Sequence, residues 1–204
     1  MRLETERLVL RPWEDRDRAP LAAILGDPHV RRYYPSVATP EQVDAQIDAA
    51  RLKAETVGYH FGAAELKSTG QLVGLIGIGH IPEATRAVLR GHPLVEVGWQ
   101  FDKAFWGQGL APEGARAWLD HGFGTLDLPE IVAFTYAGNL PSQRVMTKLG
   151  MVRDREGDFH HPSLPQGHAL APHVLYRIAN PARHQSASSA TKQGLEHFTV
   201  STRR

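Results

Sequence analysis

The chain of 204 residues contains no cysteine, which excludes disulfide bonds, thiolate catalysis and cysteine-ligated zinc. It also lacks an excess of either charge: the formal net charge is +1, so nothing indicates nucleic acid or an acidic surface as a partner. The N-terminal segment MRLETERLVL lacks the apolar stretch of a signal peptide, and no apolar run approaches the length of a membrane span. We therefore expect a cytoplasmic protein with no nucleic-acid or membrane partner.

What is present is the composition of an ordinary globular protein, with 42% hydrophobic and 22% charged residues. This length is enough for one domain with its own core. Residues 182–204 are rich in Ser, Ala, Thr and Gln and show little apolar periodicity, which predicts a flexible C-terminal tail. We expect a single domain over residues 1–181, followed by this tail.

Apolar periodicity predicts strands interleaved with helices. Strands are expected at residues 7–11, 59–66, 71–80, 94–101, 131–136 and 173–178, and helices at residues 17–26, 112–123 and 142–149. A further helix begins at Pro40, where Thr39 and Gln42 fit a capping box. Residues 68–70 are expected to form a hairpin turn, and residues 82–93 a polar connection. This order indicates an α/β (α+β) fold, in which helices cover a mixed sheet.

One loop carries the most information about function. It joins the strand at 94–101 to the helix at 112–123 and consists of Trp106, Gly107, Gln108, Gly109, Leu110 and Ala111. Its two glycines remove side chains where the backbone approaches something closely. The first amides of the following helix have no partner within that helix, and the helix dipole favours negative charge there. A diphosphate fits such a place without lysines, and this loop contains none.

Other interpretations of the loop are weaker or remain open. On the G-x-G spacing alone, a tight turn that needs glycine for geometry is the favoured explanation, because short glycine motifs often occur by chance. A P-loop requires Gly-Lys-Ser/Thr, which Gly109-Leu110-Ala111 lacks. A dinucleotide fingerprint requires a third glycine where Pro112 stands.

The loop resembles the pyrophosphate loop of the GNAT acetyltransferases, written R/Q-x-x-G-x-G/A, with Trp106 in the Arg/Gln position. A W-G-x-G-x-A loop is usual in the branch that includes the ribosomal-protein alanine acetyltransferases. Three more segments resemble that branch: residues 5–12 (TERLVLRP), residues 96–99 (EVGW) and residues 139–151 (NLPS through KLGM). Together they place the resemblance over roughly residues 3–178, in the right order and spacing.

The resemblance implies a GNAT fold with a mixed central sheet of six to seven strands, helices on both faces, and a splay between strands 4 and 5. It also implies acetyl-CoA as co-substrate and no metal. Backbone groups of Trp99, Gln100 and Phe101 are expected to pair with the pantetheine arm in the splay. The loop from Trp106 to Ala111 is expected to hold the diphosphate, and an N–H near Trp99 to face the thioester oxygen.

The catalytic candidates are Glu96 and Ser142. Glu96 is either the base that deprotonates the incoming amine or a structural carboxylate in a salt bridge. Many family members have a tyrosine where this chain has Met146, whose thioether cannot donate a proton. Ser142 is the nearest substitute for stabilising the leaving thiolate, unless it only satisfies helix amides. Asn139 is expected to contact the cofactor or to cap the helix at 142–149.

Two aromatic and imidazole-rich segments are further candidates. Four histidines, His160, His161, His168 and His173, fall in a stretch that reads as a loop, and their spacing matches no zinc pattern. The resemblance places this stretch near the acceptor site. Tyr33 and Tyr34 fall where the family lines its acceptor pocket, although ordinary packing would also explain them.

These features indicate an N-acetyltransferase that transfers acetyl from acetyl-CoA to a primary amine by direct attack in a ternary complex. The acceptor partner is a small amine or a protein N-terminus, and a homodimer is compatible with the family. The alternative is an acyl-CoA-binding regulatory module without catalysis.

Overall fold

In the computed structural model, residues 1–183 can be described, and residues 184–204 of the predicted tail lie outside them. Eight strands form one sheet in the order β1-β2-β3-β4-β5-β6-β8-β7. Neighbouring strands are antiparallel except for the parallel pair β5 and β6, so the predicted mixed sheet is confirmed. The strands are β1 Leu3–Glu4, β2 Leu8–Arg11, β3 Gly62–Leu66, β4 Leu72–His80, β5 Val95–Phe101, β6 Glu130–Tyr136, β7 Val152–His160 and β8 Pro172–Ala179.

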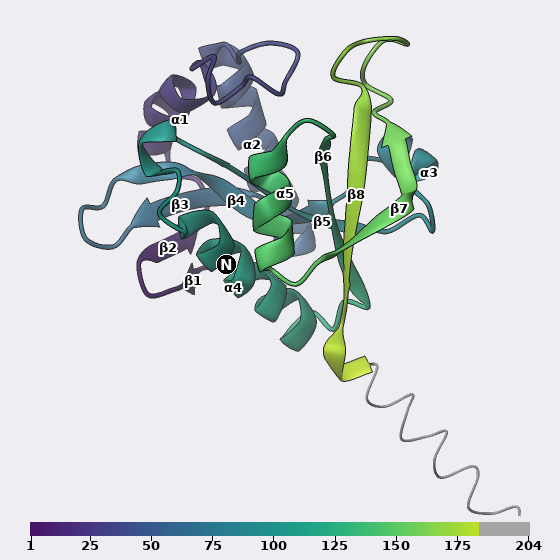
Figure 1. Ribbon diagram of the computed structural model, residues 1–204. Helices are drawn as coiled ribbons and strands as arrows, with labels where there is room; N and C mark the ends of the chain where they lie inside the picture. The colour runs from purple at the N-terminus through teal and green to yellow at the C-terminus, as the bar shows by residue number, and fades with distance from the viewer. Residues whose placement is uncertain (184–204) are drawn as a thin grey trace, which may run out of the picture.

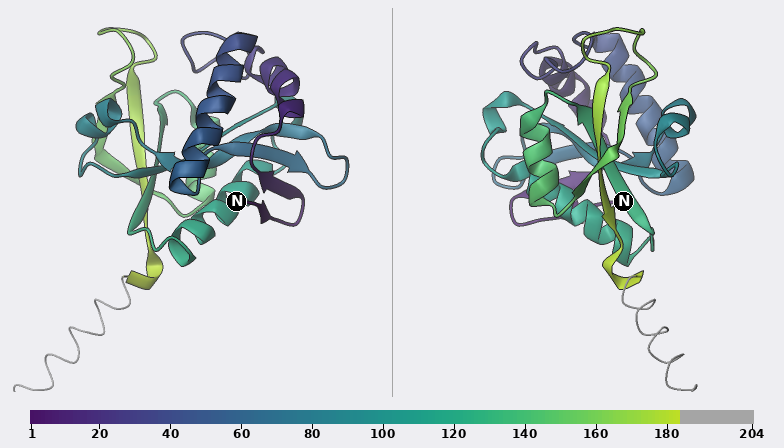
Figure 2. Two further views of the ribbon diagram at one scale, coloured as in Figure 1. Left: turned by 180° about the vertical axis from the view of Figure 1, so that it is seen from behind. Right: turned by 45° about the vertical axis from the view of Figure 1, so that its right-hand side comes forward.

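Helices cover both faces of the sheet, as predicted. The helices are α1 Arg18–Leu25, α2 Pro40–Val57, α3 Glu83–Val88, α4 Leu110–Gly124 and α5 Leu140–Lys148. Helices α1 and α2 lie on one face, and α4 and α5 lie on the other (Figures 1 and 2). The predicted capping box of α2 is present: Gln42 N–H donates to Thr39 Oγ1 at 3.3 Å, and Thr39 N–H donates to Gln42 Oε1 at 3.0 Å.

Each helical layer buries its own hydrophobic core. On the α4 side, Trp118 and Leu119 pack with Ile76 and Val97 of the sheet. On the α1 and α2 side, the buried residues are Leu21, Leu25, Val43, Ile47 and Leu75, among others. Burying whole aliphatic side chains stabilises the fold by about 1.5–3 kcal/mol each. The sheet is therefore held from both sides, and its middle strands are fixed in position.

The prediction of six to seven strands was too low, and two elements were misassigned. The stretch 158–173 was expected to be loop, but residues 158–160 end β7, whose mostly charged sequence VRDREGDFH was not predicted as a strand. β7 lies at the edge of the sheet, where one side of the strand meets water and charge is tolerated. Ion pairs hold it there, including Asp154 to Arg177 at 2.9 Å. The expected polar connection at 82–93 contains the short helix α3, which the sequence pattern did not reveal.

No helix within residues 1–183 is both long enough and apolar enough to cross a lipid bilayer.

The feature that matters most for function is the separation of β5 from β6. β4 and β5 pair along seven residues, whereas β5 and β6 pair at one position, Glu96 with Val132. After this pair the two strands diverge. The predicted splay between strands 4 and 5 is therefore confirmed, and these two strands are β5 and β6 of the sheet.

Candidate active site

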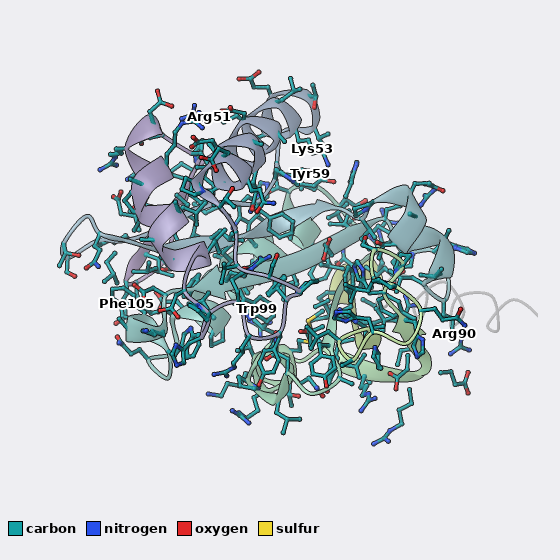
Figure 3. The ribbon with its side chains drawn as sticks, turned by 90° about the horizontal axis from the view of Figure 1, so that it is seen from above. Arg51, Lys53, Tyr59, Arg90, Trp99 and Phe105 are labelled. Atoms are coloured by element: carbon teal, nitrogen blue, oxygen red, sulfur yellow. The ribbon has the colours of Figure 1, made fainter. Side chains whose placement is uncertain are left out.

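A cavity of about 810 Å³ occupies the splay between β5 and β6. Trp99 of β5 lines it near the middle of the molecule, and Phe105, which follows this strand, lines it further toward one side (Figure 3). Side chains alternate along a strand, so β5 presents residues to both faces of the sheet. Val97 and Trp99 belong to the α4 side, where they pack with the larger core. Glu96, Gly98 and Gln100 therefore face the α1 and α2 side, so the cavity is reached from both faces.

The pairing of β5 with β4 decides which backbone groups face the splay. Asp102 N–H donates to Val73 O, and Ile81 N–H donates to Leu94 O. In an antiparallel pair, every second residue bonds to the neighbouring strand. The register therefore points the backbone groups of Trp99 and Phe101 away from β4 and toward the gap. The backbone of Gln100 faces β4 instead, so Gln100 meets the cavity through its side chain. The expectation of a Gln100 backbone contact was wrong for this reason.

The glycine loop follows directly after β5. Gly107 and Gly109 have φ of 77° and 80°, in the left-handed region that favours glycine. Within residues 1–183, the N–H groups of residues 107–111 have no hydrogen-bond acceptor, and the first bond of α4 runs from Glu113 N–H to Gly109 O. A Cβ on Gly107 would meet no atom within 4 Å, so open space lies beside these amides.

Trp106 anchors this loop to the end of β5. Its indole N–H donates to Phe101 O at 2.8 Å. This bond explains how a tryptophan can occupy the first position of the motif without contributing a charge. It also uses the Phe101 carbonyl, so Phe101 offers its N–H to the gap.

Gln108 is the one predicted site residue that does not line the cavity. Its side-chain amide donates to Ala104 O, and its carbonyl accepts from Arg7 Nη1 at 2.9 Å. Arg7 also binds Glu113 in the first turn of α4, through Nε at 2.7 Å. Arg7 therefore connects the glycine loop to helix α4, which follows the loop. Gln108 has a structural role in this connection.

Glu96 lies at the vertex of the splay and lines the cavity. Burial raises the pKa of its carboxyl from about 4.5 to about 8. No residue of the described chain forms an ion pair or hydrogen bond with it, so the salt-bridge alternative has no partner there. A carboxyl with a pKa close to the pH of the medium is suited to accept a proton.

Tyr34 approaches Glu96 from the loop that joins α1 to α2. Although 38% of its surface is exposed, its hydroxyl end is enclosed: burial raises its pKa, and the charge of Glu96 raises it further. Arg31 stacks on the Tyr34 ring, with its guanidinium carbon 3.9 Å from the centroid, and donates to Gln100 Oε1 at 3.2 Å. Tyr34 is thus part of the site rather than surface packing alone. Its place depends on the path of a loop, which no sequence motif shows.

The start of α5 forms the opposite wall. Asn139 caps the helix, since its side-chain oxygen accepts from Ser142 N–H at 3.3 Å, and both residues line the cavity. The Ser142 hydroxyl has no hydrogen-bond partner among residues 1–183. Met146 is 2% exposed and also faces the cavity. Ser142 is therefore the α5 hydroxyl that is free to donate to a ligand.

Three cations on the cavity wall were not singled out from the sequence as cofactor contacts. They are Arg32 of the α1–α2 loop and Arg144 and Lys148 of α5. The last two are separated by four residues and lie on one side of the helix, which is the signal that could have revealed them. They add positive charge to the cavity wall, and Arg32 lies over the rings of both Tyr33 and Trp106.

The four histidines separate into two groups. His161 and His173 line the cavity with ring centroids 4.9 Å apart, and burial lowers the pKa of both. His160 ends β7, His168 lies in the β7–β8 loop, and neither lines the cavity. In the described part of the chain, no group of three His, Asp or Glu residues is arranged to hold a metal ion.

Apart from Gln108, every predicted site residue lines this one cavity. Its features fit acetyl-CoA: unpaired amides beside left-handed glycines suit a diphosphate, and the unpaired edge of β5 suits an extended amide-containing arm.

Comparison with known proteins agrees with this geometry. The sequence model of the acetyltransferase (GNAT) domain matches residues 7–152. The chain belongs to the GNAT acetyltransferase family. It is therefore an acyltransferase, and the family implies the use of acetyl-CoA.

Three relatives illustrate the similarity. The uncharacterized protein YkkB of Bacillus subtilis is 34% identical over 151 residues, covering 74% of this chain and 84% of YkkB. The uncharacterized N-acetyltransferase YnaD of Bacillus subtilis is 30% identical over 178 residues, covering 87% of this chain and 96% of YnaD. The crystal structure of a GNAT-family acetyltransferase from Bacillus anthracis has a TM-score of 0.71 and 28% identity, and the match covers 88% of this chain and 99% of that one.

Proposed function

We propose that this enzyme transfers the acetyl group of acetyl-CoA directly to a primary amine, with both substrates bound at once. The supporting observation is that one cavity connects the unpaired carboxyl of Glu96 with the unpaired loop amides of Gly107 and residues 109–111. The two substrates would approach from opposite faces of the sheet and meet in the splay. The W-G-x-G-x-A loop further supports placing the chain in the branch with the ribosomal-protein alanine acetyltransferases.

Glu96 is the base in this proposal. An amine that arrives as ammonium loses a proton to Glu96, directly or through water, and its nitrogen then attacks the thioester carbonyl. The C–S bond breaks as the new amide forms, and the second proton lost by the nitrogen ends on the leaving thiolate, which departs as CoA-SH. Because the pKa of Glu96 is about 8, the fraction of enzyme with a free carboxylate increases from neutral to mildly alkaline pH.

The chain provides two further groups for this step. The Trp99 N–H points into the gap and would donate to the developing oxyanion, a kind of interaction worth about 3 kcal/mol. The Ser142 hydroxyl would donate to the leaving sulfur. Met146 has no proton to give, so Ser142 is assigned this role in place of a tyrosine.

Two measurements test the proposal together. Calorimetric titration with acetyl-CoA should show saturable binding, and a panel of amines and N-terminal peptides should yield free CoA with at least one acceptor. Binding without turnover of any amine would instead support a regulatory acyl-CoA-binding module. Absence of binding would contradict the assignment of the cavity.

A further inference from the structure

The acceptor side of the cavity is built from rings. Six aromatic or imidazole side chains from the α1–α2 loop, β6, the β7–β8 loop and β8 line it, and we call them the aromatic pocket: Tyr33, Tyr34, Phe134, Tyr136, His161 and His173. The α1–α2 loop and the β7–β8 loop lie at the same end of the molecule, at the top of Figures 1 and 2. Rings from both sides of the splay therefore gather where an acceptor would enter.

The aromatic pocket adjoins the base. Phe134 lies two residues beyond Val132, the partner of Glu96, so side-chain alternation puts its ring on the same face as Glu96. Tyr34 lies close enough to Glu96 for the charge of the carboxylate to raise the pKa of the Tyr34 hydroxyl, in addition to the larger effect of burial. An amine held at Glu96 would thus place its attached group against these rings.

All six rings are partly exposed, so each has a part that a ligand can reach. They also have protein partners. Arg31 and Arg32 each cover one face of Tyr34 and Tyr33 respectively. His161 and His173 contact the buried ring of Phe159. Tyr33 and Tyr136 approach to 5.9 Å between centroids, so a ring from the α1–α2 loop packs beside a ring from β6.

The charges on the cavity wall indicate which class of amine can bind there. Glu96 is the only acidic residue on its wall within residues 1–183, while Arg32, Arg144 and Lys148 are cationic. His161 and His173 have pKa values lowered by burial, so both are neutral at pH 7. One ammonium finds the carboxyl of Glu96, whereas Arg31 and Arg32 already cover one face each of Tyr34 and Tyr33. A second ammonium would find no carboxylate.

We propose that the acceptor is a primary monoamine that carries an aryl group, with its ammonium at Glu96 and its ring in the aromatic pocket. This rests on the proposed function, because it assigns the substrate class of the same site. The charge balance disfavours polyamines. The six rings favour an aryl group over the hydroxyl-rich ring of an amino sugar, for which the wall offers fewer partners, such as Gln46, Thr135 and Ser163.

The test compares matched amines in a CoA-release assay at pH 8. The panel is 2-phenylethylamine, hexylamine, spermidine, glucosamine and a tripeptide with a free N-terminal alanine. We expect kcat/KM for 2-phenylethylamine to exceed that for spermidine and glucosamine by at least about tenfold, and that for hexylamine by about threefold or more. Faster turnover of spermidine, glucosamine or the peptide would overturn the inference, as would equal turnover of hexylamine.

Variants of the aromatic pocket make the test specific. Phe134→Leu keeps an apolar side chain but removes the ring, so KM for 2-phenylethylamine should rise about fivefold while that for hexylamine changes less than twofold. His161→Glu adds a second carboxylate and should shift the kcat/KM ratio toward spermidine by about tenfold. Leu52→Ala, at a side chain 63% exposed on α2 and outside the cavity, is the control and should change neither ratio. Unchanged ratios in Phe134→Leu and His161→Glu, with acetyl-CoA still bound, would also overturn it.

Failure of the inference is distinguishable from failure of the proposed function. If acetyl-CoA binds and a polyamine is acetylated instead, the proposed acetyl transfer is supported and the aryl acceptor is rejected. If acetyl-CoA binds but no amine is acetylated, both the aryl acceptor and the proposed transfer reaction are rejected.

Discussion

Glu96 of β5 pairs with Val132 of β6, and in the described chain this is the one residue pair that joins the two strands. Beyond this pair the strands separate to form the cavity. The position fixes the backbone of Glu96 by pairing on both sides while its carboxyl faces the cavity. A base so placed is rigid and lies beside both proposed substrates.

Replacement of Glu96 by glutamine tests its catalytic role. Glu96→Gln keeps the shape but cannot accept a proton, so kcat at pH 8 should fall by about 100-fold. Acetyl-CoA affinity should stay within about twofold, because the proposed cofactor contacts are elsewhere. The pH profile is diagnostic: wild-type kcat/KM should rise with pH and level off above about 8, following the pKa of Glu96. The variant should not show this rise with a midpoint near pH 8. Its activity should recover partly at high pH, where the amine substrate is largely unprotonated.

Glu55→Gln is the control for this experiment. Glu55 is exposed on α2 and lies outside the cavity. Its variant should keep the wild-type rate and profile. A Glu96→Gln enzyme with the wild-type pH profile would return Glu96 to a structural role.

Some parts of this site follow from sequence because they are local. Thr39 and Gln42 cap α2 through neighbours three residues apart, and the left-handed turn at Gly109 is encoded by glycine itself. Glu96 was recognisable as a carboxylate within a largely apolar strand. The resemblance supplied the splay, which no local pattern in β5 or β6 specifies.

Other parts depend on tertiary placement and could not be predicted. Strand register decides that the backbone of Gln100 faces β4, and a one-residue shift would reverse it. The resemblance made Tyr34 a candidate for the acceptor pocket, but its approach to Glu96 depends on the path of the α1–α2 loop. β7 is charged along its length and shows no hydrophobic alternation, since it is an edge strand held by ion pairs. Gln108 looks like a ligand of the diphosphate in sequence, but the structure turns its carbonyl toward Arg7.

Replacement of Gly109 by valine tests the loop. Valine at φ of 80° is strained, and its Cβ would lie 3.5 Å from Arg7 Nη2, so the loop would lose the backbone conformation and the Arg7 contact that hold its amides in place. We expect the acetyl-CoA Kd, measured by calorimetry, to rise at least about tenfold. Gly70→Val is the matched control, because Gly70 has φ of 71° and lies in the hairpin turn between β3 and β4, outside the cavity. Gly70→Val should lower the unfolding free energy by a similar amount and should leave the acetyl-CoA Kd within about twofold of wild type. Equal Kd values for both variants would refute the role of the loop.

Removal of Arg7 tests the connection behind the loop. Arg7→Ala deletes the bonds to Gln108 O and to Glu113, so the loop should lose order without losing its own groups. One or two such bonds are worth about 1 kcal/mol, which predicts an acetyl-CoA Kd about fivefold higher and kcat within about twofold. Arg2→Ala, which removes an exposed pair with Glu4, should leave both values unchanged. If Arg7→Ala lowers kcat strongly and leaves Kd unchanged, the connection does not act through the loop.

The raised pKa of Glu96 also predicts how stability depends on pH. The carboxyl titrates near 4.5 when the chain is unfolded and near 8 when it is folded, so the folded protein holds the proton more tightly. Its favourable contribution is complete below about pH 4.5 and is lost as the pH rises through 8. Each tenfold difference in proton affinity corresponds to about 1.4 kcal/mol, but contact with the open cavity reduces the effect. We expect the wild-type protein to lose about 2 kcal/mol of unfolding free energy through this group.

Urea titrations without acetyl-CoA measure this loss. Between pH 5 and pH 9, the unfolding free energy of Glu96→Gln should gain about this amount relative to wild type. The histidines whose pKa values are lowered by burial are common to both proteins and cancel in the difference. Parallel curves over this range would mean that the Glu96 carboxyl is hydrated in the folded protein and is not held neutral by burial.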